Sequence, residues 1–255
     1  MKKIFIIFIF YNVFIKAQTN VIEYMYKIDN ISIVDTYNEF LIHNNVDDIL
    51  YFSYGNQGEN LTFEQFEKVK FDKIKLQYFI LNDKNSLLYE LGTKMPPVKI
   101  LIKDEIPKIN WKILQETKSI LGYKCIKAEG SFRGRDFIAW FTTELPMQVG
   151  PWKLQGLPGT ILEATDKALM HNFYATKISL NISYKLPEDF QNYIDEKKKN
   201  LIYIKDYIKG ENEYLLDINS QILAGFPIGA KNKSDNVRNS QKETIFEWES
   251  EPAKY

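Results

Sequence analysis

The sequence has few of the residues that covalent cross-links and metal sites commonly need. Its 255 residues include one cysteine, Cys125, and two histidines, His43 and His171. A lone thiol cannot form an intramolecular disulfide, so the fold must depend on its hydrophobic core. One cysteine and two histidines are also too few for a typical structural zinc site. We therefore predict no metal site and no cofactor.

Common catalytic motifs are missing as well. The sequence contains no G-x-S-x-G, no H-E-x-x-H, no G-x-x-x-x-G-K-[ST] and no G-x-G-x-x-G after a strand. A Cys125–His171 pair is conceivable, because the base for a cysteine nucleophile can be distant in sequence. However, both residues fall in expected strands without a third orienting group, and a free cysteine is commonly a small buried hydrophobe. We therefore predict a protein without enzymatic activity and assign no catalytic residue.

The chain also lacks an excess of charge of either sign. Its 33 basic residues balance 33 acidic ones. A neutral chain gives no support to nucleic-acid binding or to electrostatic attachment to an anionic membrane. Beyond the N-terminal region, no apolar run approaches the roughly 20 residues of a membrane-spanning helix. We therefore predict no nucleic-acid partner and no transmembrane segment in the mature chain.

The N-terminus has the pattern of a secretory signal peptide. Two lysines precede the apolar run Ile4–Ile15, which is followed by the small residue Ala17. A basic head, an apolar stretch of about 7–15 residues and a small residue at its end are typical of such signals. We predict a signal peptide over 1–17, with export from a Gram-negative cell to the periplasm or beyond. The remaining 18–255 fits one domain.

Alternation of apolar and polar residues dominates the rest of the chain and is typical of half-buried strands. It predicts one hairpin from Tyr123–Phe132 and Arg135–Thr142, and another from Thr160–Asp166 and Met170–Ser179. Sequential hairpins without intervening helices predict a mainly β (α+β) fold with a curved or partly closed antiparallel sheet. The other predicted strands are Ile22–Ile28, Thr36–His43, Asp48–Tyr54, Lys73–Ile80, Val98–Lys103, one starting at Trp111 and a closing strand through Thr244, Phe246 and Trp248.

The sequence predicts only two helices. Thr62, with Gln65 three residues later, resembles a capping box and predicts a short helix over Thr62–Lys70. A long C-terminal helix is predicted from Pro187 to Gly210, because its apolar residues recur at helical spacing. Residues 229–241 are polar and without periodicity, which indicates a loop or linker before the closing strand.

Proline and glycine concentrate in one connection. Residues 145–160 contain three of each. Proline fixes φ and glycine permits positive φ, so this segment has a specified path. Trp152 and Leu157 lie within it and must either pack inward or face a ligand. We expect Gly150–Thr160 to be ordered and packed on the sheet.

A series of short motifs surrounds this connection. They are Trp111, Gly122-Tyr123-x-Cys125, Lys127-Ala128, Phe132-Arg133-Gly134-Arg135, Ala139-Trp140-Phe141-Thr142, Pro146, Gly150-Pro151-Trp152-Lys153 and Gly156-Leu157-Pro158-Gly159-Thr160-Ile161. Together they resemble the GLPGLI family of exported Bacteroidota proteins, with Thr160 in place of the usual second leucine. The resemblance implies export and one β-rich domain. It assigns no catalytic residue, since that family is described as having no established function.

The same region contains the residues best suited to bind a ligand. Arg133 and Arg135 flank a hairpin tip next to the strand of Trp140, and arginine can grip carboxylates and stack on aromatic rings. They could instead pair with a carboxylate such as Glu163, and tryptophans are commonly part of the core. The candidate ligand or docking residues, for which we favour a structural role, are Arg133, Arg135, Trp140, Trp152 and Leu157.

The predicted β-rich, exported and aromatic-rich plan favours a binding protein. Our main prediction is a non-enzymatic periplasmic binding or carrier module, whose curved sheet shelters an apolar or amphipathic ligand. One alternative is an accessory protein of an outer-membrane complex, so the partner could also be an outer-membrane or periplasmic protein. The other alternative is a hydrolase with an unrecognised site. An internal apolar cavity, an exposed apolar patch and a cleft with clustered polar groups would favour these in turn.

Overall fold

The computed structural model describes residues 19–29, 34–44, 49–55, 60–83, 86–92, 98–224, 238 and 241–249. The predicted signal peptide lies outside these residues, as does nearly all of the predicted loop over 229–241. Within the described ranges, no helix is both long enough and apolar enough to cross a membrane.

Twelve strands form one sheet in the order β12-β6-β5-β4-β3-β2-β1-β11-β10-β9-β8-β7. The strands are β1 Thr19–Asp29, β2 Val34–Asn44, β3 Ile49–Tyr54, β4 Leu76–Asp83, β5 Ser86–Gly92, β6 Lys99–Asp104, β7 Lys112–Ile120, β8 Tyr123–Phe132, β9 Arg135–Thr142, β10 Thr160–Asp166, β11 His171–Ile182 and β12 Leu201–Tyr203. The helices are α1 Phe63–Phe66, α2 Glu188–Lys197 and α3 Ile204–Ala224, and a 3-10 turn, Lys198–Asn200, follows α2.

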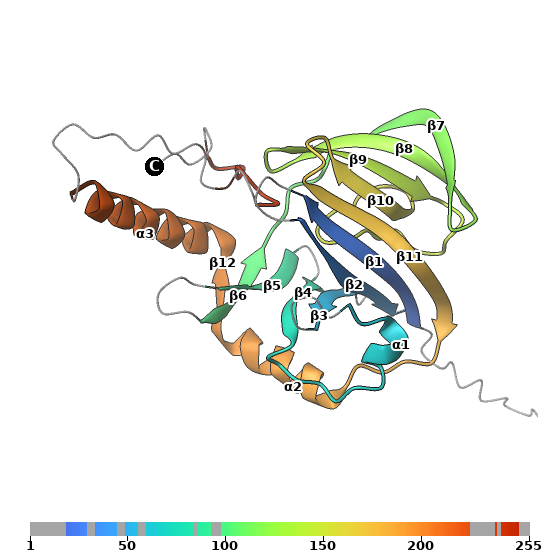
Figure 1. Ribbon diagram of the computed structural model, residues 1–255, viewed down its shortest axis with the longest axis horizontal. Helices are drawn as coiled ribbons and strands as arrows, with labels where there is room; N and C mark the ends of the chain where they lie inside the picture. Colours follow the sequence, from blue (N-terminus) through green and yellow to red (C-terminus); the bar gives the residue numbers. More distant parts are fainter. Residues whose placement is uncertain are drawn as a thin grey trace, which may run out of the picture.

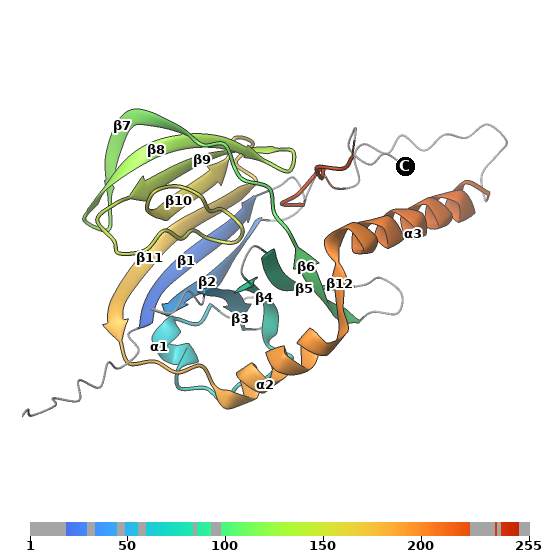
Figure 2. The ribbon, with the colours of Figure 1, turned by 180° about the vertical axis from the view of Figure 1, so that it is seen from behind.

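The sheet is strongly curved and open. Neighbouring strands are antiparallel except β12 and β6, which are parallel. Strands β7–β10 bend over one end, while β3–β6 form the other end, and α3 projects away beside β12 (Figures 1 and 2). The mainly β fold with a curved, predominantly antiparallel sheet is therefore confirmed. Both predicted hairpins are present as β8–β9 and β10–β11.

Alternation along the strands gives the sheet two cores on opposite faces. Ile22 and Leu41 belong to the larger core, which joins side chains from both ends of the curved sheet, and we call this side the inner face. Val21 and Phe40, one position away, belong to a second core on the other side. Helix α2 covers that outer face and inserts Phe190 into it. The central strands are thus buried on both sides, which accounts for their aromatic content.

The short helix begins as its sequence predicts and ends earlier. Thr62 Oγ1 accepts the amide of Gln65, and the Gln65 side chain accepts the amide of Thr62, so the capping box is confirmed. The α-helix is limited to Phe63–Phe66, and both of these phenylalanines are buried in the outer core. It ends before the predicted Lys70.

The predicted long helix is interrupted in the structure. After α2 and the 3-10 turn, Leu201–Tyr203 leaves the helix and pairs in parallel with Leu101–Lys103. Without this pairing, β6 would have an unpaired edge. Its backbone groups bond to residues 201–203, and these bonds replace the ones that a continuous helix would have made there. Gly210 does not end a helix but lies inside α3, where a Cβ would meet nothing within 4 Å.

The predicted closing strand is not a strand. Residues 241–249, which we call the strap, have an irregular course across the end of the β8–β9 hairpin. The amides of Thr244 and Ile245 both donate to Arg133 O, at 2.9 and 3.3 Å. Arg133 lies in the turn between β8 and β9 and not on a strand edge, so these bonds cap the hairpin and do not add the strap to the sheet.

Candidate functional site

The β8–β9 turn positions the two arginines that the sequence singles out. Arg133 and Gly134 have φ angles of 43° and 83°, as a two-residue turn with left-handed backbone requires. A Cβ on Gly134 would lie 2.1 Å from Thr244 Oγ1, so glycine is needed where the strap passes. Arg133 and Arg135 are both buried beneath the strap.

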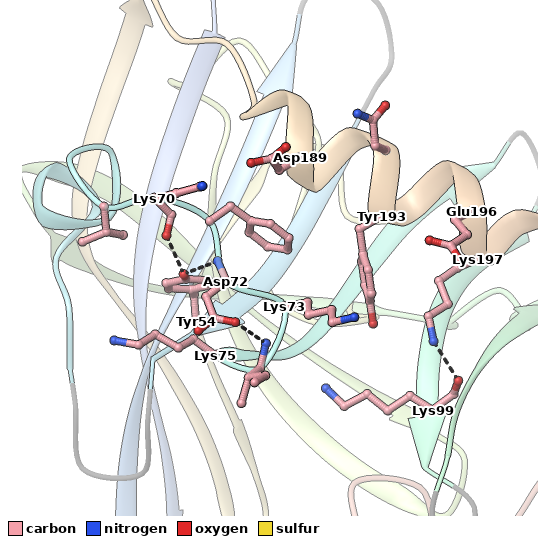
Figure 3. A pocket seen from close by; sticks show the side chains of 14 residues that line it. Tyr54, Lys70, Asp72, Lys73, Lys75, Lys99, Asp189, Tyr193, Glu196 and Lys197 are labelled. Atoms are coloured by element: carbon pink, nitrogen blue, oxygen red, sulfur yellow. Dashed lines mark hydrogen bonds between the residues drawn. The ribbon is translucent and has the colours of Figure 1, made fainter.

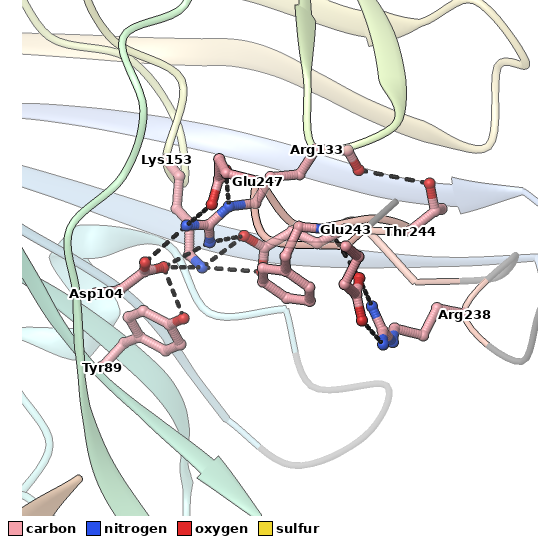
Figure 4. Close-up of polar contacts among 10 residues, drawn as sticks. Tyr89, Asp104, Arg133, Lys153, Arg238, Glu243, Thr244 and Glu247 are labelled. Carbon is pink, nitrogen blue, oxygen red and sulfur yellow. Dashed lines mark hydrogen bonds and ion pairs between the residues drawn. The ribbon is translucent and has the colours of Figure 1, made fainter. Parts of the chain in front are cut away.

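Arg133 is the centre of a buried ion cluster (Figure 4). Its Nη1 and Nη2 donate to Asp104 Oδ2 and Oδ1, at 2.7 and 2.8 Å. Asp104 Oδ2 also accepts from Lys153 Nζ at 3.0 Å and from Tyr89 Oη at 2.8 Å. The side chains of Arg133 and Asp104 are 0% exposed. Burial by itself favours the neutral acid, but the hydrogen bonds from Arg133 and the charge of Lys153 lower the pKa of Asp104 to about 2.

The strap completes this cluster with two carboxylates. Glu243 Oε1 lies 2.6 Å from Arg133 Nη1 and 2.9 Å from Lys153 Nζ. Glu247 Oε1 accepts from Arg133 Nε at 2.8 Å. The two buried cations therefore meet three carboxylates, counting Asp104. The hydrogen bonds to these carboxylates satisfy the buried Arg133 guanidinium. They also connect the hairpin, β6 and the strap, so we call the cluster a clamp.

Arg135 forms a second, separate clamp. Its Nη1 lies 2.8 Å from Asp166 Oδ2, and its Nε donates to Gln241 O at 2.7 Å. Asp166 Oδ1 in turn accepts the amide of His171 at 2.9 Å. Glu163, suggested by the sequence as a partner for these arginines, pairs with Lys118 at 2.6 Å instead.

The other candidate residues are divided between this site and the rest of the sheet. Trp152 and Leu157 are buried, as expected for a packed Pro/Gly connection. The Trp152 ring is edge-on to Phe132, with centroids 5.6 Å apart. Trp140 lies elsewhere on the sheet: it is half-buried, and its ring centroid is 4.4 Å from Lys118 Nζ.

The Gly156–Ile161 motif has a close-packed backbone. A Cβ on Gly159 would lie 2.2 Å from Thr142 O, and Gly156 has a φ of 94°. Thr160 Oγ1 donates to Met147 O at 2.7 Å, and Ile161 O accepts from Tyr24 Oη at 2.6 Å. Leu157 is buried, whereas Pro158 is exposed. These contacts fix the path of the connection over the inner face.

The conceivable Cys125–His171 pair is not assembled. Cys125 is buried and its thiol donates to Tyr123 O at 3.7 Å. Burial raises the pKa of Cys125 to about 11, which keeps the thiol protonated near neutral pH. His171 Nδ1 is hydrogen bonded to Tyr26 Oη at 2.7 Å. Among the described residues, no group of three or more His, Cys, Asp or Glu side chains is placed so that it could hold a metal ion.

An open groove on the outer face was not predicted from the sequence. It holds about 1180 Å³ between α2, the loop residues 69–75 and the start of β6 (Figure 3). Phe71 stacks on Phe190 with ring centroids 4.6 Å apart, which ties the loop to α2. Tyr193 also lines the groove, and its Oη donates to Glu90 Oε1 of β5 at 2.7 Å.

Polar groups of both signs surround these aromatic rings. Asp189, Asn192 and Glu196 of α2 line the groove and are exposed. Lys197 Nζ donates to Lys99 O at 3.0 Å, which ties the end of α2 to β6. Aromatic faces beside hydrogen-bond donors and acceptors suit an amphipathic ligand rich in hydroxyl groups. The sequence identified α2 only through its core-packing stripe, and no motif marked its other side.

Comparison with known protein families identifies a match over residues 31–203 to the family described as N-glycanase peptide, N-terminal domain. This match overturns the predicted GLPGLI membership. It also overturns the prediction of a non-enzymatic carrier, because the matching family is a domain of an enzyme, and the hydrolase alternative fits better. The GLPGLI resemblance was based on short motifs with glycine and proline. These residue types are required by the local backbone path, so they do not by themselves identify a family.

Two solved structures of PNGF-II resemble the chain. The structure in space group C2 has a TM-score of 0.48 and 22% identity, and the one in space group P21 has a TM-score of 0.46 and 21% identity. Each match covers 73% of this chain and 31% of PNGF-II, so the chain matches less than a third of that protein's length. No curated protein sequence matches the chain.

Proposed function

Because the chain belongs to the family of N-glycanase peptide, N-terminal domains, we propose that it takes part in the enzymatic removal of N-linked glycans from glycoproteins. The observation that carries this proposal is the family match over residues 31–203, which is about two thirds of the chain. The part played by this chain is to hold the substrate, and the groove beside α2 is the place where the glycan binds.

The shape and lining of the groove support a carbohydrate ligand. Its volume of about 1180 Å³ exceeds the roughly 300–1,000 Å³ of common small-molecule sites, and it is open along one side. A sugar ring presents hydroxyl groups at its edge and C–H bonds on its faces. The exposed Asp189 and Asn192 can bond to hydroxyl groups, while the half-buried rings of Phe71 and Tyr193 can contact the apolar faces.

The buried ion cluster is less suited to the chemistry of hydrolysis. Asp104 has its pKa lowered to about 2, so it holds no proton to donate near neutral pH. Both of its oxygens are also occupied by Arg133. The proposal therefore assigns binding to the groove and structure to this cluster, and it assigns no catalytic residue within the described ranges.

Export and a single-domain organisation form part of the proposal. A protein that acts on glycoproteins must meet them, and the predicted signal peptide over 1–17 would direct the chain out of the cytoplasm. The single sheet, whose larger core joins both ends, supports one domain over 18–255.

Binding to a glycoprotein before and after removal of its N-glycans tests the proposal. We expect the chain to bind the glycosylated form and not the glycan-free form. Asp189→Ala/Asn192→Ala should weaken binding roughly tenfold by removing hydrogen-bonding groups from the groove. The matched control is Asp206→Ala/Asp217→Ala, which removes two exposed side chains from α3.

Release of free glycan, followed by mass spectrometry, provides the second readout. Glycan release by the chain would show that catalytic groups lie within it. Binding without release would leave it as the substrate-holding part of the enzyme. Equal binding to both forms of the glycoprotein, with no release, would refute the proposed function.

A further inference from the structure

The strap lies on the inner face in the manner of a bound peptide. Its main chain is held by Arg133 O, which accepts the amides of Thr244 and Ile245 at 2.9 and 3.3 Å. Arg135 Nε donates to Gln241 O at 2.7 Å. No regular strand or helix occurs among its described residues. Side-chain recognition must therefore account for most of its affinity for the sheet.

Lys242 is recognised by a box of aromatic rings. Its Nζ lies 3.9 Å from the ring centroid of Tyr26, 5.1 Å from Tyr78, 5.2 Å from Phe173 and 5.6 Å from Trp152. These rings come from β1, β4, β11 and the connection between β9 and β10. An ammonium group within about 6 Å of an aromatic centroid is attracted by the negative face of the ring. Four rings from four segments make a site that suits a cation.

A carboxylate closes the end of this box. Glu39 Oε1 lies 4.0 Å from Lys242 Nζ, and Glu39 is 0% exposed. Tyr51 and Tyr78 both donate their hydroxyl groups to it. Burial raises the pKa of Glu39 and lowers that of Lys242, so each charge is costly alone and is supported by the other. Among the described residues, Lys242 is the cation that acts on the buried Glu39 carboxylate, so removing it would leave a costly buried charge.

The next residue of the strap meets the opposite kind of surface. Glu243 Oε1 and Oε2 each lie 2.9 Å from Lys153 Nζ, and Oε1 lies 2.6 Å from Arg133 Nη1 (Figure 4). The inner face thus provides an aromatic and acidic subsite followed by a basic one. Lys242 and Glu243 are neighbours in the strap, so two adjacent side chains occupy the two subsites.

We propose that the inner face is a recognition site for a Lys-Glu pair in a polypeptide segment, and that the strap occupies this site in cis. The occupant in trans is a segment of a partner protein with the same Lys-Glu pattern. The far end of the strap is exposed at Glu247 and Trp248, so a competing segment can reach it. This site is separate from the groove beside α2 and does not depend on glycan binding.

A peptide with the sequence of residues 241–249 is the probe, carrying a fluorescent label read by anisotropy. In the full chain with Lys242→Ala/Glu243→Ala, the two side chains that occupy the subsites are removed. We call this variant the emptied chain. We expect it to bind the peptide roughly tenfold more tightly than the unmodified chain does. The matched control is Lys209→Ala/Glu213→Ala, which removes an exposed Lys-Glu pair from α3 and should behave as the unmodified chain.

A peptide with alanine at the positions of Lys242 and Glu243 should bind the emptied chain roughly tenfold more weakly than the native peptide. Equal binding of the two peptides, or no binding of either, would overturn the proposal. If the emptied chain does not fold, hydrogen exchange of the unmodified chain decides. Excess native peptide should then release the amides of Thr244 and Ile245 to exchange, and unchanged protection would show that the strap is a fixed part of the core.

Discussion

Replacing Asp104 by asparagine should destabilise the protein strongly, because this change keeps the shape and removes one charge from a fully buried cluster. Arg133 donates to both Asp104 oxygens, and Lys153 donates to one of them. Removal of one partner from a buried ion pair commonly costs about 3–5 kcal/mol. Glu243 still compensates the charges of Arg133 and Lys153 in this variant. We therefore expect a loss in unfolding free energy at the lower end of this range, about 3 kcal/mol. For a chain of this size, that loss lowers Tm by roughly 6–12 °C.

The same carboxylate predicts how stability depends on pH. Burial would raise the pKa of Asp104, but Arg133 and Lys153 outweigh burial and lower it from 3.8 to about 2. Between these values the unfolded chain binds a proton and the folded chain does not, so acidification favours unfolding. The stabilisation is complete above about pH 4 and is lost as the pH falls to about 2. A shift of this size corresponds to about 2 kcal/mol.

Urea denaturation followed by tryptophan fluorescence measures both effects. The unmodified chain, Asp104→Asn and the exposed control Asp206→Asn would be compared near neutral pH and in steps toward about pH 2. We expect Asp104→Asn to be less stable near neutral pH and to lose about 2 kcal/mol less than the other two on acidification. A neutral-pH difference below about 0.5 kcal/mol from the control, or equal acid losses in all three proteins, would refute the reasoning.

Two substitutions in the Pro/Gly connection test how it is packed. Trp152→Ala should lower the unfolding free energy by about 3–5 kcal/mol, because the indole packs against Phe132 and is buried, and a urea midpoint equal to that of the parent would contradict this. Gly159→Ala should be more destabilising than Gly122→Ala in the same assay. A Cβ at Gly159 would collide with Thr142 O at 2.2 Å. A Cβ at Gly122 would meet no other atom, so that variant has only the cost of placing alanine in a left-handed backbone conformation, roughly 1–2 kcal/mol. Equal losses in unfolding free energy would show that the backbone of the connection can shift to make room for the methyl group.

The sheet could be predicted where pairing is local. The β8–β9 and β10–β11 hairpins follow from alternation and short turns, since each strand pairs with its neighbour in sequence. The interruption between α2 and α3 could not be predicted this way. Leu201 pairs with Leu101, and a helical pattern in the sequence contains no information about a partner so far away. The strap was given the wrong structure for a similar reason, because its amides bond to a hairpin turn more than 100 residues earlier.

The candidate site was only partly accessible to the same reasoning. The hairpin tip with Arg133 and Arg135 was located correctly, but Asp104 and Glu243 are 29 and 110 residues from Arg133 and no spacing rule relates them. The groove beside α2 combines loop residues 69–75 with a helix more than 100 residues later. The amino-acid composition of the loop and of the helix gives no indication that they form a groove together. Chemistry assembled by tertiary contacts is therefore visible only after the chain is folded.

The outer core explains why the groove can serve as a binding surface. Phe190 and Ile194 anchor α2 in that core, and Phe71 stacks on Phe190 at an interplanar angle of 6°. The residues of α2 that face the groove are thus mounted on a helix whose opposite side is buried. Ordering a loop upon binding costs free energy, and a wall already fixed by packing avoids much of that cost. The two cores therefore have different consequences, since the inner one holds the strap and the outer one holds the groove in shape.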